Sequence, residues 1–374
     1  SFNSQKYNVK FSTGLLNDHI ELSGRLSKIS SDGYIDRATS DLKSYFLQGA
    51  YVNDNTLIKA LVFGGKEKTY QAWYGIDAET LETDRTFNPS GIYTDDEGNV
   101  KFYDNETDNY SQDHYQLFWN QKIHNYWTTS LGLNYTYGRG YYEQYKEDQD
   151  FDFYNLDPII IGDEIINTTD LIRRRWLDND YYVVNANVNY KKDQLDVSVG
   201  AFYSHYDGDH FGEVIWSRYS NNLNIRDRYY DNNATKTDAN IYSKTNVQVS
   251  KKMNAFLDLQ VRQINYNFFG FDNQLRNVQQ DANYFFFNPK IGASYALNSS
   301  SKFYTLFAIA NKEPNRDDLT ESSPTSRPKH ETLYDLELGF KQSKSKYALS
   351  INGYFMLYDN QLVATGALND VGAS

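Results

Sequence analysis

The chain has no cysteine and only 6 prolines among its 374 residues. Disulfides and thiolate metal sites are therefore excluded, and no segment has the composition of a linker. No run of about 18 apolar residues is present, which excludes a membrane-spanning helix. Acidic residues outnumber basic ones by 49 to 37. A net charge of −12 without basic stripes does not fit a nucleic-acid partner.

Recognisable catalytic motifs are missing as well. The 6 histidines are scattered, no G-x-S-x-G nucleophile elbow occurs, and Gly138-Arg139-Gly140 lacks the spacing of a phosphate-binding loop. The acidic stretch around Asp148 and Asp150 has no calcium-loop spacing. We therefore predict that the protein is not an enzyme and has no catalytic residues, no cofactor and no resident metal.

Alternation of polar and apolar residues fills much of the chain. Between Trp127 and Gly138, apolar or aromatic residues alternate with small or polar ones, and Asn185, Asn187 and Asn189 alternate with apolar residues in the same way. Successive side chains of a strand point to opposite faces, so this pattern gives one apolar and one wet face. Repeated over hundreds of residues, it predicts an all-β chain forming an antiparallel transmembrane barrel with a hydrated lumen.

Fourteen strands are predicted, joined as antiparallel hairpins. They cover residues 6–14, 19–29, 42–52, 57–74, 111–123, 127–142, 180–190, 195–207, 235–250, 255–269, 282–297, 303–311, 332–342 and 347–358. Residues 255–269 shift phase near Gln263, which a bulge or a strand rising above the bilayer would explain. Six aromatic residues flank the short turns and could form an interfacial girdle, or could lie there by chance: Tyr51, Trp127, Tyr190, Phe256, Phe303 and Tyr347.

The connections alternate strictly between short and long. Tight turns such as Asn53 to Thr56 and Lys191 to Gln194 follow odd-numbered strands, whereas even-numbered strands lead into long segments such as 75–110, 143–179 and 208–234. Outer-membrane barrels have short periplasmic turns and longer external loops. The asymmetry therefore supports the barrel more strongly than any single motif does.

Several short motifs resemble the barrel of TonB-dependent outer-membrane receptors. They are Asn311-Lys-Glu-Pro-Asn-Arg-Asp-Asp318, then Arg327-Pro328, Gln361-Leu362 and Asn369-Asp-Val-Gly372, and upstream Gly14-Leu-Leu-Asn-Asp18 and Ser27-Lys-Ile-Ser-Ser-Asp-Gly-Tyr-Ile-Asp-Arg37. The resemblance covers essentially the whole chain. It implies a barrel of about twenty-two strands closed by an N-terminal plug, and a segment that contacts the energy-transducing protein TonB.

The chain departs from that family pattern in strand number and in lacking a plug. We therefore expect residues 1–374 to be one β-barrel domain, a central piece of a longer receptor without plug and final strands. Fourteen strands closing alone is the alternative, since even-numbered barrels of that size exist.

Candidate ligand contacts lie in the predicted external loops. Arg173, Arg174 and Arg175 precede Trp176, and guanidinium groups beside a flat ring suit an anionic metal chelate. An inter-loop ion-pair cluster, or contact with lipopolysaccharide, is the alternative. Trp216 offers a further aromatic contact. A shared metal at His205 and His210 would need the chain to bend, because a strand places them on opposite faces.

Glu313, Arg316, Asp317 and Asp318 belong to the motif at the top of a strand, and the resemblance suggests that they order the loop or meet the plug. The resemblance implies an active outer-membrane transporter that imports a scarce solute, most simply a ferric siderophore. Its partners would be membrane lipid and lipopolysaccharide, the TonB complex and a small-molecule substrate, with a surface lipoprotein as a further candidate. The alternatives are a passive porin, a structural or lipoprotein-associated barrel, and a soluble β-rich glycan-binding protein.

Overall fold

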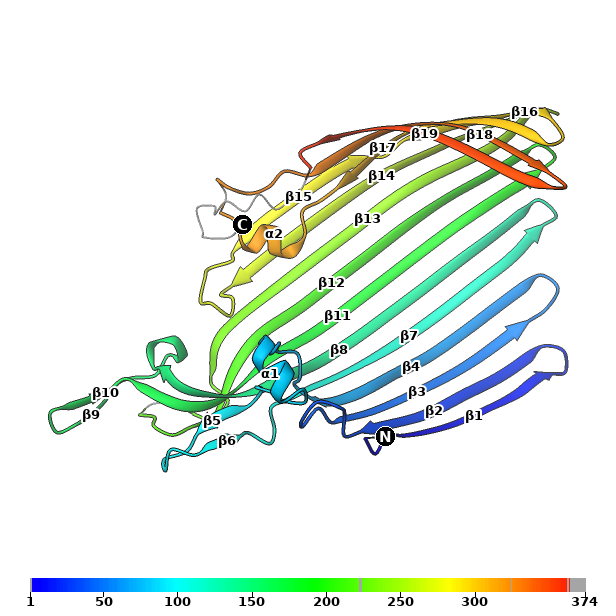
Figure 1. Cartoon of the computed structure of the whole chain (residues 1–374). Helices are drawn as coiled ribbons and strands as arrows, with labels where there is room; N and C mark the ends of the chain where they lie inside the picture. The colour runs from blue at the N-terminus through cyan, green and yellow to red at the C-terminus, as the bar shows by residue number, and fades with distance from the viewer. Residues whose placement is uncertain (1, 222–223, 324, 362, 364–374) are drawn as a thin grey trace.

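The computed structural model describes residues 2–221, 224–323, 325–361 and 363. One large curved sheet makes up most of it (Figure 1). The strands are β1 (Gln5–Leu16), β2 (Ile20–Ser31), β3 (Ser40–Val52), β4 (Thr56–Tyr70), β5 (Ile92–Thr94), β6 (Val100–Phe102), β7 (Thr107–His124), β8 (Trp127–Asp150), β9 (Ile159–Ile161), β10 (Glu164–Ile166), β11 (Thr168–Lys192), β12 (Leu195–Ser217), β13 (Arg228–Ser250), β14 (Met253–Gly270), β15 (Gln280–Phe287), β16 (Lys290–Asn298), β17 (Ser301–Lys312), β18 (Glu331–Lys344) and β19 (Tyr347–Asp359). The helices are α1 (Ala78–Thr83), α2 (Arg316–Thr320) and the 3-10 turn Asp152–Tyr154. No helix in these residues is long and apolar enough to cross a membrane.

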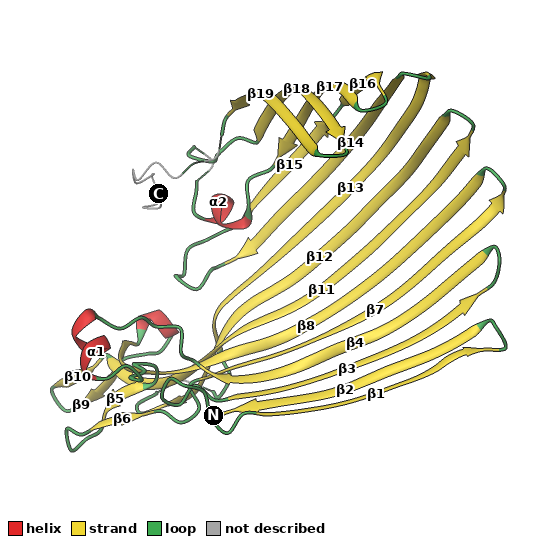
Figure 2. Ribbon diagram, turned by 45° about the vertical axis from the view of Figure 1, so that its right-hand side comes forward, coloured by secondary structure: helices red, strands yellow, loops and turns green. Residues whose placement is uncertain are grey.

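The main sheet is an antiparallel meander, which confirms the predicted fold class. Its order is β1-β2-β3-β4-β7-β8-β11-β12-β13-β14-β16-β17-β18-β19, with β15 also paired to β14. The short turns all lie at one end of the sheet and the long connections at the other (Figure 2). The two small ribbons β5–β6 and β9–β10 belong to the long connections.

The predicted strand over 282–297 is divided by a proline. β15 and β16 both pair with β14 in a single register, since Val261 lies opposite Phe287 and Asp258 opposite Lys290. Pro289 has no N–H to donate, so the ladder is interrupted there without a change of face.

The two faces of the sheet differ as the alternation predicts. One face carries apolar or aromatic residues that pair across successive strands: Leu117 of β7, Leu133 of β8, Val184 of β11 and Tyr203 of β12. Asn185 lies on the other face, opposite Gly132 and Phe202. The helix α2 lies on the concave, polar face (Figure 1) and packs its Leu319 against Ala234 and Phe268. The apolar face is therefore the convex outer one, and the asparagine stripe faces inward.

Aromatic residues border the apolar belt on the outer face. Tyr115, Tyr135 and Tyr182 stack across three strands, with ring centroids 5.8 and 4.8 Å apart. On β8, Trp127 and Tyr137 are separated by about 25 Å along the barrel axis, at a rise of about 3.3 Å per residue and a tilt of about 40°. This matches the apolar height of outer-membrane barrels. Of the six aromatics predicted beside the short turns, Phe256 is the exception, because it lies on the inner face over Gly292.

The strands continue much further than predicted at the long-connection end. Residues 143–179 and 208–234 were expected to be loops, but β8 and β11 pair as far as Asp150 and Thr168, and β12 extends to Ser217. Beyond the apolar belt the outer face no longer stays apolar, so the alternation fades while the backbone ladder continues. Likewise β14 has no bulge near Gln263, because its register with β13 is unbroken from Asn254 to Gly270.

Candidate functional site

A polar patch on the inner face of β11 to β14 is the candidate functional site, and α2 lies over it. The sequence Asn315-Arg-Asp-Asp318 forms this short helix through a reciprocal capping box: the Asn315 side chain accepts from the Asp318 N–H, and the Asp318 carboxylate accepts from the Asn315 N–H. Leu319 anchors the helix in the apolar cluster around Ala234 and Phe268. The patch is thus ordered from above by α2.

An ion-pair network fixes the start of the connection between β17 and β18 to the sheet. The Glu313 carboxylate is 9% exposed and accepts from Lys236 Nζ at 2.8 Å and from Arg262 Nη1 at 3.0 Å. Arg262 also donates to both oxygens of Asp238. Burial alone would raise the pKa of Glu313, but the Lys236 hydrogen bond and the two cations together lower it. Glu313 is therefore held ionised, and the network is balanced in charge.

Arg316 extends from α2 to the middle of the patch. Its Nη2 donates to Asn232 Oδ1 at 2.8 Å, and the guanidinium lies 5.6 Å from the ring centroid of Phe268. No carboxylate of a described residue lies within ion-pair distance of it. Asp317 is the neighbouring helical residue, and its carbonyl accepts the Glu321 N–H that ends α2.

His210 and Tyr206 lie on the same inner face of β12, beneath Arg316. Burial and the nearby Arg316 charge lower the pKa of His210 to about 4, so the imidazole is neutral at pH 7. The Tyr206 hydroxyl donates to Asn179 Oδ1 at 2.6 Å. The patch therefore offers neutral hydrogen-bonding groups beside a guanidinium that no described carboxylate pairs with.

Arg175 and Arg173 border the patch on β11. Arg175 Nε and Nη1 donate to the hydroxyls of Tyr229 and Tyr142 at 3.2 and 3.1 Å. Arg173 is only 8% exposed, and its donors are taken up by Gln144 Oε1 and the Tyr154 hydroxyl. Arg175 consequently keeps free donor capacity toward the inner space, whereas Arg173 is committed to packing.

The other four predicted contacts lie on the outer face. Arg174 pairs with the buried Glu143 at 2.7 Å, and Trp176 Nε1 donates to Glu213 Oε2 at 2.9 Å. Trp216 stacks on Tyr145 with centroids 6.1 Å apart, and His205 bonds Thr237 Oγ1. Because 173–176 is a paired strand, the period of two divides the arginine run between faces. His205 and His210 are divided in the same way, and the described residues contain no cluster of three metal-ligating side chains.

Sequence reasoning missed the residues that complete the patch. Lys236, Asp238 and Arg262 were placed in strands, but nothing in their local sequence links them to Glu313, which lies 77 residues from Lys236. Their even spacing on the polar face is a usable signal, because an inward Asp238 and an inward Arg262 on adjacent strands predict an ion pair. Tyr229 lay in a segment that was expected to be a loop, and Tyr142 was the last residue of the predicted strand 127–142.

The arrangement is suited to holding an anion. Arg175 and Arg316 are cations on the inner face without a carboxylate partner among the described residues. Guanidinium groups bind carboxylate, catecholate-type and phosphate oxygens through paired N–H donors. Tyrosine hydroxyls and the neutral His210 can add hydrogen bonds around such a ligand.

A family model and solved structures resemble the chain. The model described as "TonB dependent receptor-like, beta-barrel" matches residues 10–374. Comparison with curated protein sequences finds no match. The fold resembles that of the ferric-catecholate import receptor Fiu from E. coli K12 in its closed form, with a TM-score of 0.68, 11% identity, and coverage of 100% of this chain and 58% of Fiu.

Two further solved structures share the fold. The pyoverdine-bound FpvA of P. aeruginosa gives a TM-score of 0.63 at 12% identity and covers 95% of this chain and 46% of its own. The siderophore receptor PiuA of Acinetobacter baumannii gives 0.62 at 12% identity, with 95% and 55% covered. The chain thus spans about half the length of these receptors.

Proposed function

Because the chain belongs to the family of TonB-dependent receptor β-barrels, we propose that it forms the greater part of the wall of an outer-membrane importer for an anionic metal chelate. Family members are receptors and transporters rather than enzymes. The observation that carries the substrate class is the pair of inner-face arginines, Arg175 and Arg316, which have no carboxylate partner in the part of the chain that the structure describes. The solute would enter from the long-connection end.

The proposed route lies along the concave face. The apolar belt on the convex face would contact lipid, and the asparagine-rich inner stripe would line a hydrated path. The proposal also includes a plug and a segment that contacts TonB, both in other parts of the receptor. Energy for import would be supplied through TonB. Neighbours of similar fold import ferric catecholates and ferric citrate, which supports an iron chelate as the first substrate to test.

Uptake by a deletion strain tests this proposal. Cells without the receptor should fail to accumulate ⁵⁵Fe from one of ferric catecholate, ferric citrate or ferric pyoverdine, and the full-length gene should restore uptake only when TonB is present. Restored uptake without TonB would indicate passive diffusion, and unimpaired uptake of all three chelates by the deletion strain would refute this substrate class.

A variant pair tests the inner-face site. Arg175→Gln removes a cation but keeps a donor to the tyrosine hydroxyls, so chelate affinity should fall about 10- to 100-fold, as expected for one charge-assisted contact. Arg139→Gln is the matched control, because Arg139 lies on the outer face and pairs with Asp178 at 3.2 Å. Equal losses in both variants would contradict recognition by the inner patch.

A further inference from the structure

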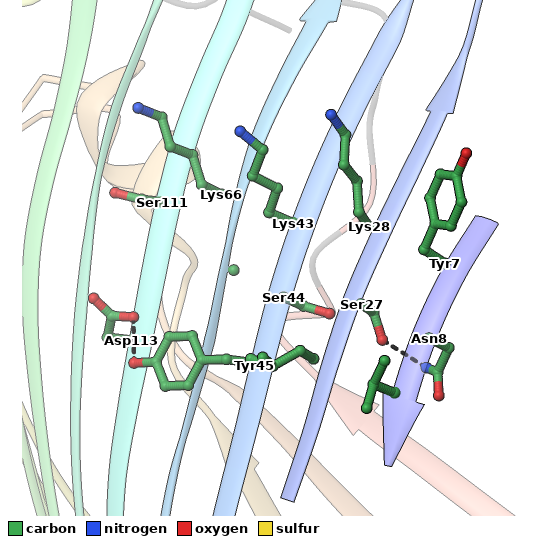
Figure 3. Close-up of a pocket in the computed structure, with 13 residues that line it drawn as sticks. Tyr7, Asn8, Ser27, Lys28, Lys43, Ser44, Tyr45, Lys66, Ser111 and Asp113 are labelled. Atoms are coloured by element: carbon green, nitrogen blue, oxygen red, sulfur yellow. Dashed lines mark hydrogen bonds between the residues drawn. The ribbon is translucent and has the colours of Figure 1, made fainter. Parts of the chain in front are cut away.

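Three lysines form a row on the outer face, at the edge of the apolar belt. Lys28 of β2 lies directly opposite Lys43 of β3, and Lys43 directly opposite Lys66 of β4. Figure 3 shows the three side chains extending in the same direction from neighbouring strands. We propose that this row binds the phosphate groups of an anionic glycolipid of the outer leaflet, such as lipopolysaccharide. The proposal rests on the outer-membrane placement proposed above.

The row is in the same position relative to the belt on each strand. On β2, β3 and β4, the outward-facing residues from Ile20, Tyr51 and Ile58 onward are apolar, aromatic or glycine until each lysine is reached, as in Ile58, Ala60, Val62, Gly64 and Lys66. The lysines lie toward the long connections, because Lys66 is opposite Ser111, which on β7 lies beyond Tyr115 of the stacked tyrosines. Aliphatic stems at this level can cover lipid chains while the ammonium groups meet headgroups.

Neighbouring lysines are unfavourable without an anion. Like charges directly opposite each other destabilise a sheet. Lys28 has an exposed pair with Asp41 at 3.5 Å, whereas Lys43 and Lys66 have no ion-pair partner within 4.0 Å among the residues that the structure describes. A bound phosphate would remove this repulsion, since each lysine offers three donors to its oxygens.

A groove of about 560 Å³ runs beneath the row. Its apolar part includes Tyr7, Val9 and Leu26, which are more than half exposed. Gly64 has no side chain between Tyr45 and Asp113, so the Tyr45 hydroxyl crosses it to donate to Asp113 Oδ1 at 2.8 Å (Figure 3). This bond engages the one carboxylate of the groove. An acyl chain fits the apolar part, and a phosphate fits the lysines.

On the outer face, the position of the charged residues favours an anionic lipid at β2 to β4 rather than at β11 and β12. On β11 and β12 the first charged outward residues beyond the apolar belt are Asp180 and Asp207, which lie opposite each other and would repel phosphate. Arg139 continues the lysine row across Ser111 but is paired with Asp178. The basic sector is continuous with the lipid-facing belt, so an amphipathic ligand explains both parts of the groove where a free anion explains only the lysines.

Lipid titration of the full-length receptor tests the proposal. The probe is diphosphorylated lipid A in detergent micelles, compared with its dephosphorylated form and with inorganic phosphate. The variant Lys28→Gln/Lys43→Gln/Lys66→Gln should bind diphosphorylated lipid A on the order of 100-fold more weakly than wild type, given the usual gain for each lysine near an anionic surface. The control Lys6→Gln/Lys10→Gln/Lys59→Gln, on the inner face of β1 and β4, should bind like wild type.

The remaining outcomes separate the alternatives. Unchanged affinity in the outer-face variant, or equal binding of the dephosphorylated lipid, overturns the proposal. Displacement of lipid by millimolar inorganic phosphate assigns the row to a free anion instead. Heat-modifiable migration in gels verifies that each variant folds. If the triple variant does not fold, Lys43→Gln alone is tested instead, and its affinity for diphosphorylated lipid A should fall by an intermediate amount. Chelate uptake should be unaffected by these variants, so failure of the import proposal would be seen separately in the wild-type uptake assay.

Discussion

Glu106 is a carboxylate that the β4–β7 connection holds out of water. It is 3% exposed, and one of its oxygens accepts the Tyr145 N–H at 2.9 Å. Burial raises the pKa of Glu106 to about 7, against the opposing effects of the Tyr145 hydrogen bond and of nearby Lys146 and Arg173. A raised pKa in the folded state gives stability that is complete below the unfolded value near 4.5 and is lost as the pH rises through about 7.

Replacing this residue with an amide should remove that pH dependence. Glu106→Gln keeps an oxygen acceptor for Tyr145 but cannot ionise, so the variant should gain about 1–3 kcal/mol over wild type at pH 8 and little at pH 5. Protease protection of the connection, measured across this pH range in the full receptor, reports the change. Glu97→Gln, in an exposed turn of the same connection, should leave the profile unchanged. A gain that is equal at both pH values would contradict an ionised, buried Glu106.

Glu313 presents the opposite case, a carboxylate that is kept charged by two cations. Glu313→Gln should leave Lys236 and Arg262 undercompensated and loosen the β17–β18 connection by about 1–3 kcal/mol, less than a fully buried pair because both cations are partly exposed. Trypsin cleavage after Arg316 and Lys329 should accelerate accordingly. Glu337→Gln, also inward on β18 but remote from α2, is the control. Unchanged cleavage would mean that Leu319 and the capping box hold the connection without Glu313.

Strand extension is the feature that decides which predicted residues can share a site. The existence of β8, β11 and β12 could be predicted, because their lipid-belt halves alternate cleanly. The halves of these strands that lie toward the long connections could not be predicted. Residues there, such as Arg173 to Trp176, do not separate into an apolar and a polar row. If this run were a loop, its three guanidinium groups could lie together. Because it is a paired strand, Arg173 and Arg175 lie on the inner face and Arg174 lies on the outer face.

Close backbone approach within these strands gives an element-scale prediction. A Cβ at Gly140 would clash with the carbonyl oxygen of Asn109 and lie 2.6 Å from the Tyr110 Cα. Gly140→Ala should therefore separate β7 from β8 and destabilise the barrel by about 1–3 kcal/mol. At Gly49 the nearest atom to a new Cβ is a Leu22 methyl at 3.5 Å, so Gly49→Ala should be tolerated. The unfolding temperature from heat-modifiable migration measures both, and equal tolerance would refute the clash.

In the whole molecule, odd and even residues of each strand separate an apolar outer face from a polar inner face. Strand number, antiparallel order and the sorting of short and long connections were all predictable, because the strands of the main sheet follow a period of two and their connections alternate in length. The Lys236, Asp238, Arg262 and Glu313 network was not predictable as a whole, because it depends on a connection that folds back over strands distant in sequence.

Neighbouring residues of β11 test this parity directly. Ala186→Arg places a charge on the outer face near the middle of the belt and should cost about 2–4 kcal/mol. Asn185→Arg places the same side chain on the hydrated inner face and should cost much less. Urea unfolding of each receptor variant in lipid vesicles gives the difference. Equal costs, or a larger cost for Asn185→Arg, would reverse the assignment of faces.

The length of β8 affects the electrostatic potential that a charged solute would encounter as it approaches the protein. The strand runs from Tyr137 at the edge of the belt to Asp150, a distance of about 30 Å along the barrel axis. Electrostatic potentials decay over a Debye length of about 8 Å in physiological salt. In the proposed outer-membrane placement, the negative surface potential of the leaflet would therefore be screened at the rim, and an anionic solute would reach the arginines of the protein without first crossing the repulsive field of the membrane.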